Sequence, residues 1–463
     1  MGSLSPGTTD LVPRGGGQLR QLHGAGAGAG ALSIDFAWNG PPPGSAAAGK
    51  ARLLLSDSLG CMMAGLGHAR VRAFGAALAA TMPGTIRLPG VDAPLSAAGA
   101  SAVLAAAMCW DEANEGLARA HGRPGLSVAP LCIAALAEGR VTLGEALAAF
   151  ALGYEVGGRA GEAWRIRPGM HVDGSWHSLG AAATAVRLAG GDAAAAGRAV
   201  RLAGCQVPFA MYAPIAAGMD GRNSYPAHAA LLGTLAAAAA MAGMDAPEVG
   251  VAEARRVALG LEAPAEVAPP GQWLLEEAYI KPFAGVRHAH YAAAAALDLG
   301  ASSPDDIAAI TLSTYAEALR YAANRAPRSA IAAQFSLSWA VAAALVQRDL
   351  GPAAYTDAAL SDPALRRIEA LVTLAEDETL TAAGRRGATV AVTLRDGTRR
   401  AARAERVAGD PDLPMDAAAV RAKAIRFATP VLGAGGVRTA LAILLDGEDA
   451  LRPGGMLLAP NAA

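Results

Sequence analysis

The chain has 463 residues, of which 53% are hydrophobic and 17% are charged, and its formal net charge is −1. This length allows a large buried core or two domains, and the low charge content predicts helices covered by other helices or by a second copy of the chain. A charge balance near zero, without a dense run of lysine and arginine, argues against nucleic-acid binding.

Residues 1–30 are polar and glycine-rich, and their start, MGSLSPGTTDLVPRGGG, resembles an expression tag followed by a protease site. We expect a disordered or tag-like tail here. No secretory signal is visible, so we expect a cytoplasmic protein. The cysteines are too widely scattered for a zinc site or a disulfide framework, and buried thiols are expected instead. These cysteines are Cys61, Cys109, Cys132 and Cys205.

Residues 31–280 read as one helix after another, separated by glycine and proline, and predict the first part of a helical domain. Their high alanine content predicts dense packing between the helix axes. The most apolar run, Ala227–Met244, is mostly alanine and glycine and lacks aromatic and basic flanks. We expect a buried core helix there rather than a membrane span.

The pattern of residues 281–410 predicts a separate α+β domain. A short strand is expected around Ile310–Tyr315, and ATVAVTLRDGTRRAARAERV predicts a hairpin that turns at Asp396-Gly397. The segments HAHYAAAAALDLG, AQFSLSWAVAAALVQRDLG and PALRRIEALVTL predict intervening helices. Residues 411–463 return to helix, so we expect the last segment to pack back onto the first.

The segment MCWDEANEGLARAHGRPG carries the first cluster of titratable residues. On a continuous helix, Asp111 and Glu115 would share one face, and Glu112 adds a further negative charge. His121 follows on a loop of glycine and proline. One interpretation is a solvated acidic helix end. The other is an acid/base cluster in which Asp111 orients His121 and raises its pKa; two carboxylates and a histidine also leave a metal site open.

Two histidines, His171 and His177, lie in GMHVDGSWHSLG just before an alanine-rich helix. Their spacing of six residues does not match a helical zinc pair. The positive end of a helix dipole lowers the pKa of a nearby histidine and favours the neutral imidazole, which serves as a base or a polarising donor. The alternative is a structural histidine held by a backbone carbonyl.

The segment YIKPFAGVRHAHYAAAA places Lys281, Arg287, His288 and His290 within ten residues at the start of a helix. Backbone N–H groups and these side chains predict an anion site for carboxylates, or else an ordinary basic helix start. Arg222, on the glycine-rich loop GMDGRNSYPAHAALLG, is a weaker candidate for the same role.

Together, in this order, these motifs resemble the MmgE/PrpD family, which includes 2-methylcitrate dehydratase, cis-aconitate decarboxylase and iminodisuccinate epimerase. The resemblance spans about residues 48 to 450 and rests on LLLSDSLGCMMAG, D-E-x-x-E…H, GYEVGGR, GSWHSLGAAATAVRLAG, KPFAGVRHAHYAAAAALD, AQFSLSWAVAAAL and AKAIRFATPVLG. It implies a mainly α fold, with a large all-α domain built from both chain ends and a smaller inserted α+β lid. It also implies a homodimer, an active site between the domains, and neither cofactor nor metal.

The resemblance places the family's catalytic residues on Asp111, His121, His177 and Lys281, and its lid tyrosine on Tyr321. Tyr321 is expected to donate a hydrogen bond to the substrate.

Two of the departures from the family pattern bear on the substrate. Glu115 stands where cis-aconitate decarboxylase has a threonine, and Arg222 stands where the family has a lysine. Arginine keeps the charge but does not deliver a proton. The extra carboxylate of Glu115 is expected to repel a tricarboxylate. We therefore expect a less anionic acid than 2-methylcitrate or cis-aconitate, from a specialised biosynthetic pathway.

The sequence thus predicts a cofactor-independent lyase or isomerase that performs dehydration, decarboxylation or epimerisation next to a carboxylate, through an enolate-like species. His121, oriented by Asp111, is the expected acid/base group, with His177 as its partner. Two alternatives stay open: a repurposed enzyme that cyclises or rearranges a larger intermediate, and a non-catalytic binding or scaffold protein. The expected substrate-binding residues are Glu115, Arg222, His171, Arg287 and His290.

Overall fold

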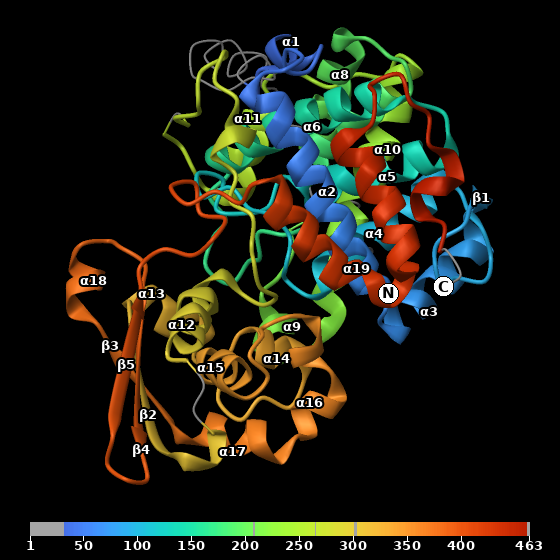
Figure 1. Ribbon diagram of the computed structural model, residues 1–463. Coiled ribbons are helices and arrows are strands. Elements are labelled where there is room, and N and C mark those ends of the chain that lie inside the picture. Colours follow the sequence, from blue (N-terminus) through green and yellow to red (C-terminus); the bar gives the residue numbers. More distant parts are fainter. Residues whose placement is uncertain (1–31, 207–208, 264, 301–302, 461–463) are drawn as a thin grey trace, which may run out of the picture.

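The computed structural model describes residues 32–206, 209–263, 265–300 and 303–460. The tail predicted for residues 1–30 lies outside the described residues. Figure 1 shows a large helical body and, below it, a smaller body in which helices cover a sheet. The described chain is mainly helical, and its main sheet has four strands.

The first half of the chain is almost entirely helical. Hydroxyl groups of Ser45, Ser96 and Thr142 cap three of its helices by accepting hydrogen bonds from backbone nitrogens, which satisfies donors that a helix start leaves free. Its elements are α1 Ile34–Ala37, α2 Ala46–Leu66, α3 Ala69–Thr81, β1 Pro83–Ile86, α4 Ala97–Trp110, α5 Gly125–Glu138, α6 Leu143–Ala163, α7 His177–Leu188, α8 Ala193–Gly204, α9 Ala213–Ala216, α10 Tyr225–Met241 and α11 Gly250–Leu259.

Helix α7 lies at the centre of the helical body, against α5, α6, α8 and α10. Small residues allow the close approach that the alanine-rich sequence predicts. A Cβ on Gly180 of α7 would lie 2.5 Å from the carbonyl oxygen of Gly153 in α6, a distance too short for any larger residue. The loop that precedes α7 is therefore held against a rigid core.

The smaller body is built on a mixed sheet with the strand order β3-β2-β4-β5. Strand β2 pairs in parallel with β3 and antiparallel with β4, which pairs antiparallel with β5. The predicted hairpin is confirmed, and Gly397 in its turn has a φ of 85°. Helices α12, α15 and α17 contact the sheet and lie on one side of it in Figure 1. The elements are α12 Arg287–Asp298, β2 Ile307–Thr314, α13 Ala316–Ala322, α14 Ala330–Gln334, α15 Leu337–Val346, α16 Asp357–Ser361, α17 Pro363–Leu371, β3 Val372–Glu376, α18 Glu378–Ala382, β4 Ala388–Leu394 and β5 Arg399–Ala404.

One predicted helix ends earlier than expected. The segment PALRRIEALVTL was expected to be helical throughout, but α17 ends at Leu371 and Val372–Glu376 forms strand β3. The β-branched Val372 and Thr373 suit a strand, and β3 pairs with Ile310–Thr314 of β2.

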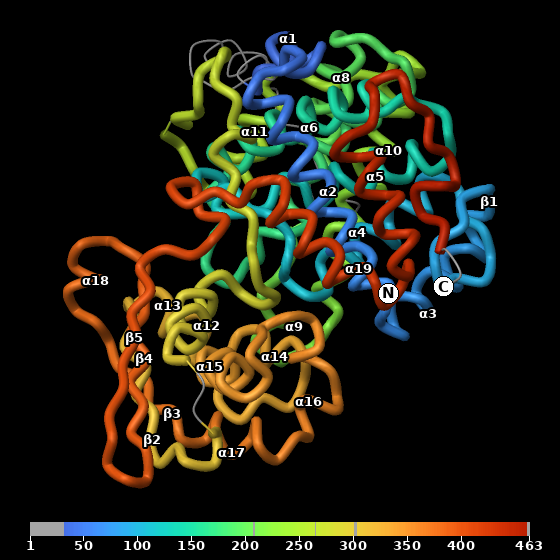
Figure 2. Tube along the Cα trace, in the orientation of Figure 1, coloured from blue at the N-terminus to red at the C-terminus, as the bar shows by residue number. Residues whose placement is uncertain are grey.

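The C-terminal helix α19, Ala417–Leu441, returns to the helical body and packs along α2. Figure 2 shows the two traces, red and blue, side by side. The Lys423 Nζ donates to Asp57 Oδ1 at 2.6 Å and to the carbonyl oxygen of Ala113 at 2.7 Å. The last segment therefore packs on the first, as predicted. The domain boundaries at residues 281 and 411 and the lid role stay predictions.

The two passages of the chain between the bodies lie against each other. The backbone nitrogen of Ile280, on the way into the smaller body, donates to the carbonyl oxygen of Gly409, on the way out, at 3.0 Å. Gly409 has a φ of 96°, and a Cβ there would lie 1.8 Å from the carbonyl oxygen of Ile280. This close contact requires glycine.

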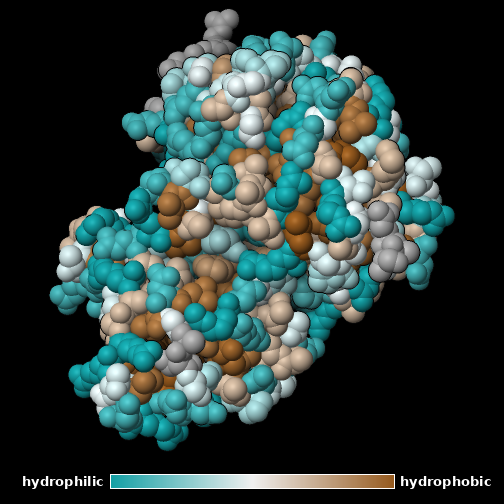
Figure 3. Space-filling model, in the orientation of Figure 1, coloured by the Kyte–Doolittle hydropathy of each residue, from teal (hydrophilic) through white to brown (hydrophobic). Residues whose placement is uncertain are grey.

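Among the described residues, the helical segment Ala417–Asp446 is long and apolar enough to cross a membrane, by length and composition alone. It packs on α2 and carries the buried Lys423, as a core helix does. The run Ala227–Met244 largely forms α10, in which the buried residues are mostly alanines. On the face in Figure 3, hydrophilic residues cover most of both bodies. These features are compatible with a soluble protein.

Candidate active site

A cavity of about 720 Å³ lies where the helical body meets the smaller body. Its walls come from the α4–α5 loop, the α6–α7 loop and the segments around Lys281, Tyr321 and Arg386. Its charged lining residues are the cations Arg123, Arg165, Arg167, Lys281, Arg287 and Arg386 and the carboxylates Glu112, Asp173 and Glu317. Six cations against three carboxylates give a surface that attracts small anions.

The α4–α5 loop begins with a sharp change of direction. Helix α4 ends at Trp110, Asp111 is its C-cap, and Glu112 has a left-handed φ of 52°. Asp111 and Glu115 consequently do not share a helix face, and the spacing argument that grouped them is wrong. The turn instead brings the Glu112 side chain into the cavity wall.

The remainder of this loop is held by short antiparallel contacts. Gly116 and Tyr279 exchange backbone hydrogen bonds of 3.0 and 2.9 Å, and the nitrogen of Leu117 donates to the carbonyl oxygen of Gly122 at 2.8 Å. These contacts fix His121, which also has a positive φ, at the cavity. They also fasten the loop to the segment that carries Lys281.

Glu112 is buried in the floor of the cavity, where three cations surround it. Its carboxylate pairs with Arg222, with Arg123 at 3.0 Å and with Lys281 at 3.1 Å. Burial alone would raise its pKa, but these three cations hold the pKa of Glu112 well below its usual value. Burial lowers the pKa of Lys281 to about 8, against the opposing effect of Glu112. The floor therefore contains an ionised carboxylate beside a lysine whose pKa of about 8 lies close to neutral pH.

Asp173 lies beside this group and connects it to the α6–α7 loop. Its carboxylate pairs with Arg123 and, at 3.1 Å, with Arg222. Although burial opposes ionisation, Arg123 holds the pKa of Asp173 far below its usual value. The backbone nitrogen of Asp173 donates to His171 Nδ1 at 3.1 Å. Burial lowers the pKa of His171 to about 4, so this half-buried ring is neutral near pH 7 and has its proton on Nε2.

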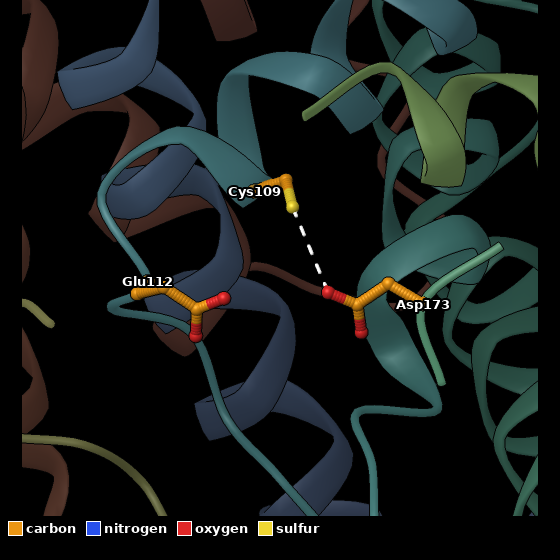
Figure 4. A group of neighbouring side chains, drawn as sticks. All are labelled: Cys109, Glu112 and Asp173. Carbon is orange, nitrogen blue, oxygen red and sulfur yellow. Dashed lines mark hydrogen bonds between the residues drawn. The ribbon is translucent and has the colours of Figure 1, made fainter. Parts of the chain in front are cut away.

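Cys109, Glu112 and Asp173 offer ligand atoms within 4.8 Å of one another (Figure 4). This donor set does not fit a divalent cation, because Arg123 and Arg222 already pair with both carboxylates. Burial raises the pKa of the Cys109 thiol to about 11, whereas a metal ligand must be a thiolate. The chemistry of the group is therefore that of an ion-pair network.

His177 lies behind the cavity wall rather than in it. Its ring is buried and stacked on Trp176, with 3.9 Å between centroids, and its Nε2 is 4.0 Å from Asp173 Oδ1. Neither ring nitrogen has a hydrogen-bond partner among the described residues. Burial lowers the pKa of His177 to about 4. His177 is thus not a lining residue, and the catalytic role predicted for it stays a prediction.

Asp111 does not orient His121. Its Oδ1 is 3.0 Å from His68 Nε2, and its buried Oδ2 has no hydrogen-bond partner among the described residues. His68 lies at the start of α3, 43 residues earlier in the chain. This pairing follows from the left-handed turn at Glu112, which separates Asp111 from the rest of the loop.

Glu115 is also outside the cavity lining, contrary to its predicted substrate contact. It is fully buried, accepts a hydrogen bond from the Tyr154 hydroxyl at 2.9 Å, and accepts another from the Gly125 nitrogen at 3.0 Å, at the start of α5. Burial raises the pKa of Glu115 to about 7, against these hydrogen bonds. Its charge therefore gives no reason to exclude a tricarboxylate.

The other predicted binding residues divide between the wall and the interior. Arg287 lines the cavity, pairs with Asp410 and lies 3.8 Å from the centroid of the Tyr279 ring. Arg222 is completely buried beneath the floor, and His290 is buried with its Nε2 3.1 Å from the carbonyl oxygen of Gly285. Arg222 and His290 are thus not lining residues.

His121 and Tyr321 line the cavity from different bodies. His121 is an exposed residue. Partial burial of its ring, with a further effect from Arg165, lowers the pKa of the imidazole, so it is neutral near pH 7. Tyr321 is 45% exposed and stacks on the ring of His288, with 5.9 Å between centroids. Their positions agree with the predicted placement of both residues at one site.

Six of the predicted residues thus line one cavity, namely His121, His171, Lys281, Arg287, His288 and Tyr321. The sequence interpretation missed Arg123 and Asp173 and named Glu112 only as a further negative charge, whereas all three form the floor of the cavity. The sequence did contain a hint, because both missed residues lie close to predicted site residues. Arg123 is two residues after His121, and Asp173 is two residues after His171.

Comparisons with known proteins agree with this architecture. Residues 38–266 match the MmgE/PrpD N-terminal domain, and residues 283–446 match the MmgE/PrpD C-terminal domain. A search of curated proteins found no match. The two matches cover most of the chain and most of the residues that line the cavity, whereas Tyr279 and Lys281 lie between the two matched segments. This family is known for dehydratase-type activity. The chain therefore belongs to the MmgE/PrpD family.

Proposed function

We propose that this protein is a cofactor-independent lyase or isomerase that acts on a small organic acid next to a carboxylate, through an enolate-like intermediate. One observation carries the proposal: a cavity of about 720 Å³ combines an excess of cations with histidines that are neutral near pH 7. Such a cavity attracts an organic anion and offers it a base.

Substrate carboxylates bind to the cations of the wall. Arg165 and Arg167 are exposed, and Arg287 lies deeper, against Tyr279. Guanidinium groups hold carboxylates through paired hydrogen bonds, which fixes the orientation of the acid.

His121 is the proposed base. Its neutral imidazole takes a proton from the carbon next to the carboxylate, and the C–H electron pair moves into the carboxylate to form an ene-diolate. The Lys281 ammonium stabilises the new negative charge, since it lies in the low-dielectric floor. In a dehydration, the proton on His121 leaves with the departing hydroxide as water; in an epimerisation, a proton returns to the opposite face.

The test uses proton NMR in D₂O with a panel of small di- and tricarboxylates. It detects exchange of the proton next to the carboxylate, loss of water and loss of carbon dioxide. His121→Asn is expected to lower turnover by about 100-fold or more, the usual range for an acid/base group. His228 is exposed and outside the cavity lining, so His228→Asn is the matched control and keeps wild-type turnover. Full activity in His121→Asn would remove that residue from the mechanism.

A second candidate is cyclisation or rearrangement of a larger acid, which the cavity size favours. About 720 Å³ lies within the roughly 300–1,000 Å³ typical of pockets for drug-sized ligands. Product analysis with bulkier acids separates the two candidates, because small dicarboxylates would then be inert. A protein that binds acids and converts none of them would support the scaffold alternative.

A further inference from the structure

The Glu112 carboxylate occupies a pocket made of three cationic side chains. Arg123 and Lys281 lie at 3.0 and 3.1 Å, and Arg222 contacts the same carboxylate oxygen as Arg123. Lys281 also donates to the backbone oxygen of Glu112 at 2.7 Å. The neighbouring buried carboxylate of Asp173 shares two of these cations, Arg123 and Arg222, whereas the buried carboxylate of Asp57 pairs with a single cationic side chain. Three convergent cations are what a protein uses to bind the carboxylate of a ligand.

The backbone at Glu112 opposes the presence of any side chain. Its φ of 52° is left-handed, and it directly follows the C-cap of α4, a position at which glycine is usual. A non-glycine residue there costs free energy, and such strain concentrates at functional sites. The left-handed backbone at this position favours glycine, yet the residue is a glutamate.

The cationic pocket also has hydrogen-bond donors to spare. Arg222 is completely buried, and its Nε and Nη2 have no hydrogen-bond partner among the described residues. Buried donors without partners are rare and mark places where a further acceptor belongs. Glu112 and Lys281 both line the cavity, so an acceptor that replaces the Glu112 carboxylate would enter from the substrate side.

We propose that Glu112 fills a carboxylate subsite of this cavity and thereby determines specificity. Without the Glu112 side chain, the three cations would bind one carboxylate of a substrate. Because the Glu112 carboxylate already occupies this position, the natural substrate has one carboxylate fewer than an acid that would fill the cavity of a chain without this side chain. The subsite itself rests on the ion pairs, whereas its effect on specificity rests on the proposed function.

A binding experiment tests the subsite without any activity. Glu112→Gly removes the side chain and suits the left-handed φ, which leaves a space among the three cations. Sodium acetate, compared with sodium chloride at equal ionic strength, should raise the Tm of Glu112→Gly by about 2 °C or more and leave that of the wild type unchanged. Asp245 pairs with Arg201 at the surface, so Asp245→Ala is the control and should show no acetate effect. Equal shifts in all three proteins, or none in Glu112→Gly, would overturn the proposal.

A second variant covers the case in which Glu112→Gly does not fold. Asparagine tolerates a left-handed φ and is shorter than glutamate, so Glu112→Asn should be stabilised by formate, a smaller anion, while the wild type is not. The absence of that difference would likewise contradict the subsite.

A kinetic experiment tests the effect of Glu112 on specificity. It compares kcat/KM for an acid with kcat/KM for its analogue that has one more carboxylate. The ratio should shift about tenfold or more toward the more highly charged acid in Glu112→Gly, the effect of about one ion pair. An unchanged ratio, with acetate binding intact, would overturn the specificity role alone. A wild type that converts no acid would refute the proposed function and leave the acetate result standing.

Discussion

Lys281 reaches the cavity floor from the segment that enters the smaller body, and its ammonium is the proposed partner of the enolate. Burial lowers its pKa to about 8, so the ammonium is present below pH 8 and is lost as the pH rises through that value. We expect kcat to fall above about pH 8. In Lys281→Arg the charge persists at high pH, and the alkaline limb should move upward or vanish. Lys50→Arg, which changes a lysine outside the cavity lining, should keep the wild-type profile. An unchanged limb in Lys281→Arg would exclude Lys281 as its origin.

The raised pKa of Glu115 leads to a separate prediction about the pH dependence of stability. Burial raises this pKa from the usual value of 4.5 to about 7, so between these pH values the folded chain binds a proton that the unfolded chain has released. The contribution of Glu115 to stability therefore declines as the pH rises through this window. Glu115→Gln, which does not titrate, should gain up to about 3 kcal/mol over the wild type between pH 4.5 and pH 8. Urea unfolding at both pH values measures the difference. A pH-independent difference would refute the raised pKa.

Residue types could be predicted from the sequence better than residue contacts. Asp111 was assigned to the wrong histidine, since its true partner, His68, depends on a left-handed residue at Glu112. Glutamate has no sequence preference for that conformation, so nothing local in the sequence signals the turn.

At the scale of elements, the contact between α2 and α19 joins the two ends of the chain through Lys423. Its ammonium is buried against Asp57 and also binds the backbone of the α4–α5 loop at Ala113. Lys423→Met should lower the free energy of unfolding by about 3–5 kcal/mol, because it leaves Asp57 as an unpaired buried charge. Arg421 lies on the same helix as Lys423 and makes an exposed pair with Asp446. Arg421→Met should therefore cost less than about 1 kcal/mol. Equal costs in denaturant unfolding would contradict the buried pairing.

Elements with strong local signals could be predicted from the sequence. The Asp396-Gly397 turn between alternating runs predicted the β4–β5 hairpin, and glycine or proline marked most helix boundaries. Strand β3 was missed because it continues directly from α17, and its parallel pairing with β2 is a contact between residues 62 positions apart, Ile310 and Val372. No periodicity within a short window encodes such a partner.

For the whole molecule, we expect a homodimer. Six of the large exposed apolar side chains belong to residues 211–257, and the low charge content agrees with a covered surface. Leu235→Glu should convert the dimer to a monomer in light scattering, whereas Met456→Glu, on another exposed apolar residue near the C-terminus, should not. A wild-type protein that is already monomeric at micromolar concentration would refute this expectation. The exposed residues are Met211, Met219, Leu235, Met241, Met244 and Val257.

The paired passages at Ile280 and Gly409 bear on the predicted lid role of the smaller body. If this body moves as a lid, we expect it to rotate about an axis beside Lys281, where the two connections touch. Contacts away from this axis, such as the hydrogen bond from Gln334 Nε2 to the carbonyl oxygen of Trp110, would then break. Groups at this axis, Lys281 and Glu112, keep their separation during the rotation, while Tyr321 and Arg386 swing outward with the smaller body. We therefore expect the ligand to enter and leave on the side of Tyr321 and Arg386, while the ion pair between Glu112 and Lys281 stays intact during each turnover.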